Sequence, residues 1–340
     1  MEYRALSRCR SELMGIAMLW VMCFHAFDLD LGSRLLNFVR SAGFGGVDIF
    51  ILLSAMGLVM SREKKPAEYG AFMLRRARRL LPSYYVVMVP YGIFNVFFHG
   101  VPWASLLWNG LLLNYWVHCA GSFNWYICGA MTFYAVTPFF HGRLKAARSR
   151  EAAAALWVCV SLLVCQLLMQ EEYWQYTDVF YRFGVFFLGL LLGLYITEDK
   201  KLQKEDILFW AAWLCAGIAY LAAALWRMGY EDFFLYLPMC HLFLFTTVPM
   251  CLTLCAAFEH LPLGWLQKPL RKIGECSLEI YLLNVSVFSE VELLRRLLSF
   301  GPDNRLYYLV SFAVNIALGM ALHRFMECLS QNRLQKTIAR

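Results

Sequence analysis

The stretch GFGGVDIFILLSAMGLVM, residues 43–60, carries a single charged side chain, Asp48. A bilayer core about 30 Å thick needs about 20 mainly apolar residues in one helix. This stretch therefore predicts a helix that crosses a membrane. Runs of similar length and composition recur along the chain, at about 12–31, 80–98, 123–141, 152–170, 180–197, 207–226, 234–257, 273–291 and 305–325. We expect an all-α polytopic membrane bundle of about ten transmembrane helices.

The composition supports a membrane protein. Of 340 residues, 60% are hydrophobic and 16% are charged, whereas soluble domains average about 45–50% and 25%. A soluble globular enzyme, a disordered chain and a coiled coil are therefore excluded. The chain shows no internal repeat and no hydrophilic second domain, so residues 1–340 are expected to form one integral membrane domain.

The basic residues predict how the chain is oriented. Most of the 31 Lys and Arg lie in alternate connections, at 1–12, 62–79, 142–151, 197–206, 259–272 and after residue 324. Basic connections usually face the cytoplasm, which places both termini there and argues against a nucleic-acid partner. A further apolar run, 103–117, would invert every later helix if it spanned. We therefore expect it to be re-entrant or to lie at the outer interface.

Polar residues inside apolar runs are the candidates for chemistry. His25 can act as a general base near neutral pH or be a plain interfacial residue. Asp48 needs a partner or a proton. Arg75, Arg76 and Arg79 can bind phosphate through their guanidinium forks, or form the basic collar of an ordinary membrane helix. The cysteines are scattered, with no Cys/His cluster at zinc spacing, so no metal site is expected.

These segments form a series of motifs. They are ELMGIAMLWVMCFHA (12–26), GFGGVDIFILLSAMG (43–57), the arginines before Pro82, NWYICGAMTFYAVTP (124–138), YRFGVFFLGLLLG (181–193) and ECSLEIYLLNVSVF (275–288). In order and spacing the series resembles acyltransferase family 3, membrane O-acyltransferases that modify sugars of bacterial surface polysaccharides. Two positions depart from the family pattern. Met14 stands where the family has an arginine, which Arg8 or Arg10 could replace, and Asn284 stands where it has a histidine.

The resemblance implies an enzyme that moves an acyl group, usually acetyl, from cytoplasmic acyl-CoA to a glycan hydroxyl. Acyl-CoA is then a co-substrate, and no cofactor is bound permanently. Arg76 and Arg79, with Arg75, would hold the phosphates of the donor. His25 would take the proton of the acceptor hydroxyl, and Asp48 would orient His25.

Other residues in the matched motifs receive binding or supporting roles. Asn124, Trp125 and Tyr126 would form a platform for sugar, or else be ordinary residues of the aromatic belt. Arg182, Glu279, Tyr281 and Asn284 would support the site.

Two other interpretations stay open: a transporter or flippase of the polysaccharide pathway, and a catalytically silent family member, which Met14 and Asn284 allow. In each case we expect a multi-pass protein of a bacterial inner membrane. The lipid bilayer, the glycan acceptor and proteins of polysaccharide assembly are its expected partners.

Overall fold

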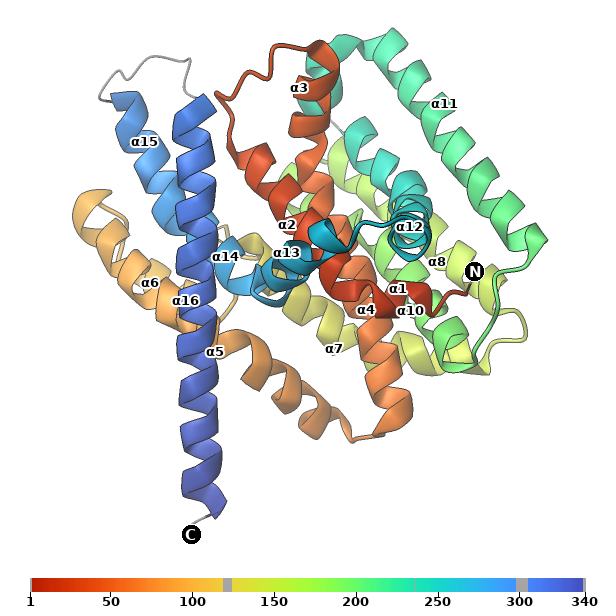
Figure 1. Ribbon diagram of the computed structural model, residues 1–340, viewed down its shortest axis with the longest axis horizontal. Helices are drawn as coiled ribbons and strands as arrows, with labels where there is room; N and C mark the ends of the chain where they lie inside the picture. Colours follow the sequence, from red (N-terminus) through yellow and green to blue (C-terminus); the bar gives the residue numbers. More distant parts are fainter. Residues whose placement is uncertain (1, 119–123, 236, 298–304, 339–340) are drawn as a thin grey trace.

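The computed structural model describes residues 2–118, 124–235, 237–297 and 305–338. This part of the chain is helical, and its only extended pairing is an isolated bridge between Glu2 and Lys201 (Figure 1). The helices are α1 (Ala5–Arg8), α2 (Arg10–His25), α3 (Arg34–Ser41), η1 (Ala42–Gly45), α4 (Gly46–Lys64), α5 (Tyr69–Phe98), α6 (Ala104–Gly110), α7 (Trp125–Ala146), α8 (Arg150–Gln170), η2 (Trp174–Tyr176), α9 (Thr177–Phe180), α10 (Phe183–Thr197), α11 (Lys204–Leu235), α12 (Leu237–His260), α13 (Gly264–Glu275), α14 (Ser277–Leu283), η3 (Asn284–Phe288), α15 (Ser289–Leu297) and α16 (Arg305–Ile338).

The expected all-α membrane fold is confirmed. Seven helical segments of the described chain are long and apolar enough to cross a membrane: Arg34–Lys64, Tyr69–Phe98, Arg150–Gln170, Thr177–Thr197, Lys204–Arg227, His241–His260 and Arg305–Gln331. Each overlaps one of the ten expected runs. The other three runs contain α2, α7 and the series α14, η3 and α15, which do not meet both conditions. The count of ten and the cytoplasmic placement of both termini stay predictions.

The core of the bundle is the contact between α4 and α10. In the two helical segments to which α4 and α10 belong, the most apolar stretches are 78% and 83% buried. The corresponding stretches of α8, α11 and α16 are only 17–22% buried, so these helices present apolar surface outward. At Gly189 of α10 an added Cβ would collide with the Leu52 carbonyl and the Ala55 side chain of α4. Glycine therefore lets these two backbones approach closely.

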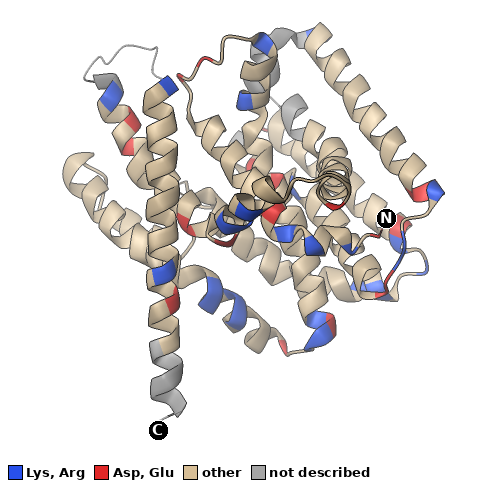
Figure 2. Cartoon of the chain, in the orientation of Figure 1, with Lys and Arg blue, Asp and Glu red and all other residues tan. Residues whose placement is uncertain are grey.

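The run 103–117 does not form a long helix. It contains only α6, whose seven residues are about 10 Å long. That is too short to span, as expected, and whether it is re-entrant or interfacial stays open. Lys and Arg gather at the start of α5 and around the α4–α5 connection, while α3 and the α15–α16 end carry a few (Figure 2).

Candidate active site

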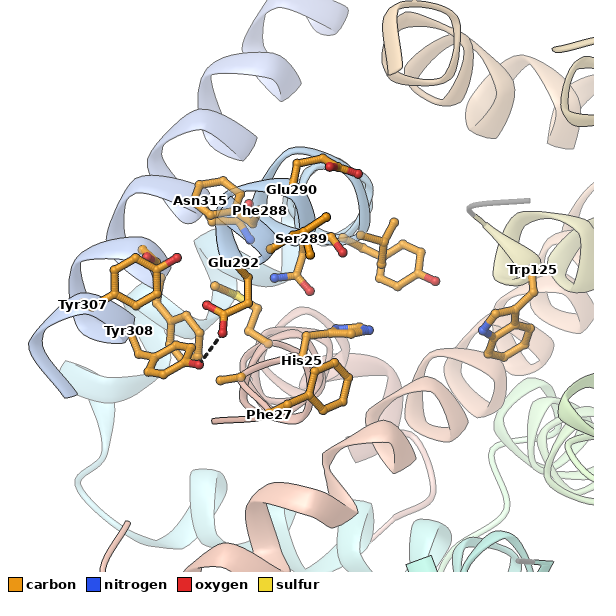
Figure 3. Close-up of a pocket in the computed structure, with 18 residues that line it drawn as sticks. His25, Phe27, Trp125, Phe288, Ser289, Glu290, Glu292, Tyr307, Tyr308 and Asn315 are labelled. Atoms are coloured by element: carbon orange, nitrogen blue, oxygen red, sulfur yellow. Dashed lines mark hydrogen bonds between the residues drawn. The ribbon is translucent and has the colours of Figure 1, made fainter. Parts of the chain in front are cut away.

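A cavity of about 450 Å³ lies at the end of α2, and we call it the His25 cavity (Figure 3). Its wall combines segments far apart in sequence, namely the end of α2, the stretch from Tyr281 to Leu293, and the first turns of α16. Trp125 of α7 also lines it. The fold therefore brings three residues into one site: His25, the predicted base; Trp125, a predicted sugar-binding residue; and Asn284, which replaces the histidine of the family pattern.

His25 is held at the end of a helix. The chain leaves helical geometry at Ala26, whose carbonyl accepts a 2.8 Å hydrogen bond from Nη1 of Arg40. The rings of Phe24 and Phe27 lie edge-on to the imidazole, at centroid distances of 5.3 and 6.2 Å. These contacts fix the ring beside the cavity.

Nδ1 of the His25 ring is buried without a hydrogen-bond partner among the described residues. The Asn284 side chain and the Val21 carbonyl lie beside the ring. Neither makes a hydrogen bond of normal geometry to the buried Nδ1. Since buried polar atoms are usually paired, the imidazole is available to a ligand.

A second cavity, of about 380 Å³, lies between α2, α4, α5, α14 and α16, and we call it the arginine cavity. Arg10, Arg76 and Arg79 line it. Nη2 of Arg76 donates to Ser61 Oγ at 2.7 Å. The Nε atoms of Arg10 and Arg76 are buried without a hydrogen-bond partner among the described residues. Unpaired guanidinium donors in a cavity suit an anion such as phosphate.

A basic recess continues from this cavity. Its volume is about 320 Å³, and it shares Arg10 and Gly57 with the arginine cavity. Lys64 and Lys65 lie in its wall. Cationic side chains therefore extend from the cavity to the basic end of the bundle.

The structure distinguishes among the candidate arginines. Arg75 is absent from the lining of both cavities, and its Nη2 lies 3.5 Å from the Lys65 carbonyl. Arg8 forms an ion pair with Glu259. Met14, which stands where the family has an arginine, also lines the arginine cavity. Arg10 rather than Arg8 therefore supplies a positive charge in the cavity that Met14 lines.

Among the described residues, Tyr281 alone lines both cavities. The ring of Tyr126 packs edge-on against it, with centroids 5.2 Å apart. Tyr126 faces the arginine cavity and Trp125 faces the His25 cavity. Asn124 caps α7 by accepting a hydrogen bond from the Ile127 amide at 3.1 Å. The three predicted sugar residues thus do not form one platform, and only Trp125 lies in the His25 cavity.

The model of the acyltransferase domain family matches residues 13–324. The chain belongs to this acyltransferase family. Over 93 residues the acyltransferase is also 34% identical to the peptidoglycan O-acetyltransferase OatA of Listeria monocytogenes. That match covers 26% of this chain and 13% of the relative. No solved structure matches the chain.

Asp48 of the acyltransferase pairs with Arg182. Both side chains are fully buried, and Nε of Arg182 lies 3.4 Å from Oδ2 of Asp48. The guanidinium also lies over the Trp125 ring, 4.5 Å from its centroid. No described contact joins Asp48 to His25, so an orienting role of Asp48 stays a prediction. The contact through Arg182 instead links Asp48 to the wall of the His25 cavity.

Motif reasoning missed two polar side chains of α16. His323 lines the arginine cavity, where its Nδ1 lies 3.1 Å from Glu279, and Ser83 donates to the same carboxylate at 2.7 Å. Asn315 lines the His25 cavity. Both interrupt an apolar run, and this interruption was the signal in the sequence that could have identified them.

Among the described residues, no group of three or more His, Cys, Asp or Glu could hold a metal ion.

Proposed function

We propose that this acyltransferase moves an acyl group, in the simplest case acetyl, from acyl-CoA to a hydroxyl of a cell-surface or lipid-linked glycan. The observation that carries the proposal is the pair of cavities. One presents a histidine whose Nδ1 has no hydrogen-bond partner among the described residues. The other presents three arginines, and Tyr281 lines both. Family membership and the name of the relative support acetyl transfer to a glycan.

The arginine cavity suits the donor. Coenzyme A carries several phosphate groups, and bidentate contacts from arginine are the strongest that a protein offers to phosphate. Arg76, Arg79 and Arg10 would hold them, with Lys64 and Lys65 at the entrance of the recess. The thioester arm would then extend toward Tyr281.

The His25 cavity suits the acceptor. The hydroxyl oxygen attacks the thioester carbonyl carbon while the imidazole accepts the hydroxyl proton. The C–S bond then breaks, and the sulfur leaves as a thiol with the proton that His25 held. The products are an O-acyl ester and free coenzyme A, so no other reactant is needed.

Tyr281 lines both cavities, and its ring rests on Tyr126. We propose that this ring forms a wall between the two cavities and moves when the thioester reaches His25. Rotation of the Tyr281 side chain would join the two spaces without moving a helix. We propose that this happens when the donor binds.

The proposed setting is a bacterial inner membrane. We propose that the donor enters from the cytoplasm, because Lys and Arg gather around α4 and α5 and basic connections usually face that side. The acceptor would reach the His25 cavity from the other side. Proteins that assemble and export the glycan are the partners that this arrangement would serve.

The test is a His25→Ala variant in cells that lack the native gene, with mass spectrometry of surface glycan. We expect the acyl mass to be absent while the protein is inserted normally. His241→Gln is the matched control, because His241 lines neither cavity. Loss of exported glycan with retained O-acylation would support a transporter instead, and an unchanged glycan would contradict the proposal.

A further inference from the structure

Three polar side chains in the wall of the His25 cavity have atoms that lack a hydrogen-bond partner among the described residues. His25 is joined there by Asn284 and Asn315, which are 7% and 1% exposed. Oδ1 of Asn284 and both Oδ1 and Nδ2 of Asn315 are buried with no hydrogen-bond partner among the described residues. Leaving a buried polar atom unpaired costs about 1–3 kcal/mol. Such a cost, repeated around one cavity, indicates a ligand that supplies the missing bonds.

The three groups come from separate elements that line one cavity, and Figure 3 shows His25 and Asn315 beside it. His25 ends α2, and Asn315 lies one-third of the way along α16. Asn284 begins η3, a π-helical turn between α14 and α15. Such turns are rare and often occur at functional sites. Here the turn contributes Asn284, Val285 and Phe288 to the wall of the cavity.

The charges of the wall restrict the ligand. No described lining residue is Lys or Arg, so an anionic group finds no cation in the cavity. The two carboxylates already have partners. Tyr91 donates to Glu290 at 2.8 Å, and His99 lies 2.9 Å away from it.

The second carboxylate, Glu292, is held in the same manner. It accepts a hydrogen bond from Tyr308 at 2.9 Å and pairs with Arg295 at 2.7 Å. Neither carboxylate is left to bind a cation, and both repel an anion. The atoms of this cavity that still lack a hydrogen-bond partner among the described residues therefore belong to His25, Asn284 and Asn315, and not to a carboxylate.

We propose that the His25 cavity binds an uncharged sugar residue, a hexose or N-acetylhexosamine, and that Asn284 and Asn315 hold it. This inference rests on the proposed function and names its acceptor class. An Asn amide offers both donors and an acceptor, which matches a hydroxyl pair or an acetamido group. The two amides thereby orient one hydroxyl toward His25. Uronic acids and phosphorylated sugars are excluded, because the wall supplies carboxylates and no cation.

The test is direct binding to the full-length protein in nanodiscs, by saturation-transfer NMR. The probes are methyl β-glucoside, methyl N-acetyl-β-glucosaminide and methyl β-glucuronide. We expect saturation transfer to at least one neutral glycoside and none to the glucuronide at equal concentration. Equal or tighter binding of the glucuronide would overturn the inference.

Variants place the binding in this cavity. Asn315→Leu, which keeps the number and branching of the side-chain heavy atoms, is expected to raise the Kd of the neutral glycoside about tenfold, since two hydrogen bonds are lost. Asn315→Asp should weaken binding of the neutral glycoside as well, because the cavity then gains a negative charge. This variant also tests the site if the leucine variant fails to fold. Ser161→Ala is the control, a buried polar residue outside the cavity, and its Kd should equal that of the wild type. An unchanged Kd in a folded Asn315 variant would overturn the inference.

Acyl transfer from acetyl-CoA is measured in the same nanodiscs, with glycan extracted from the host. Transfer by the wild type without binding of any neutral glycoside would overturn the sugar site and leave the proposed function standing. Binding that depends on Asn315 without any transfer would overturn the proposed function and leave the sugar site standing.

Discussion

Replacing Arg182 by Met should destabilise the protein through the carboxylate that it leaves behind. Asp48 and Arg182 are both fully buried, and their charged atoms approach to 3.4 Å. Breaking a buried ion pair costs about 3–5 kcal/mol, whereas replacing both partners by neutral residues is often harmless. We therefore expect Arg182→Met to lose about 3–5 kcal/mol of unfolding free energy.

The double variant Asp48→Asn, Arg182→Met should recover most of that loss. It still lacks the packing of the guanidinium on Trp125 and Tyr181, at 4.5 and 4.4 Å, which contributes about 1–2 kcal/mol. It also lacks the contacts of Arg182 with Asp178, whose carbonyl accepts a 2.7 Å hydrogen bond from Nη1. The double variant should therefore be about 2–3 kcal/mol more stable than Arg182→Met, and this recovery plus the loss measured for Asp48→Asn alone gives the coupling energy between the two sites.

The assay is chemical unfolding of the four proteins of this cycle in detergent micelles. Arg150→Met is the control, since Arg150 pairs with Glu198 at an exposed site and should lose less than about 1 kcal/mol. Additive effects of the two substitutions, or a loss for Arg182→Met no larger than that of the control, would refute the reasoning. Activity per folded molecule of the double variant then tests the orienting role, which predicts that this variant is inactive even where it folds.

The remaining predictions concern the donor, the wall between the cavities and the position of His25. Arg76→Ala should raise the KM for acetyl-CoA at least tenfold, because a charge-assisted hydrogen bond contributes about 1.5–3 kcal/mol. Arg75→Ala should leave the KM within about twofold of the wild type. Release of the thiol measures both values, and equal effects of the two substitutions would contradict the assignment. Tyr281→Ala should increase hydrolysis of acetyl-CoA in the absence of acceptor, since water would reach the thioester through the joined cavities, and a rate equal to that of Tyr281→Phe would argue against a wall. Arg40→Ala frees the Ala26 carbonyl and should lower kcat with little change in the Kd of acetyl-CoA, as measured by calorimetry; a raised Kd with normal kcat would disprove this role.

The sequence could predict the membrane fold, because long runs with few charged residues are typical of membrane-spanning helices. His25 stood out as a polar residue inside such a run, and Arg76 and Arg79 as part of a basic cluster directly before one. Each of the three lines a cavity, and their roles stay predictions. Arg8 and Arg10 could not be separated, since the chain changes from α1 to α2 between them and motif spacing does not show where helices break.

The division of the aromatic residues was also beyond the sequence. Trp125 and Tyr126 are neighbours, but consecutive residues of a helix point about 100° apart, and here they face different cavities. Asn315 belongs to no motif. Its place in the site depends on α16 packing against α14 and η3, so that Asn315 and the end of α2 line one cavity, and no local pattern encodes this arrangement.

The central claim is that His25 carries out the transfer while a separate cavity holds the donor. Single-turnover transfer from radiolabelled acetyl-CoA, with purified protein in nanodiscs and extracted glycan, tests it most directly. We predict that His25→Gln binds acetyl-CoA with the wild-type Kd and transfers label to glycan at least a hundredfold more slowly, the lower end of what a general base contributes. Transfer at the wild-type rate by His25→Gln would contradict the account.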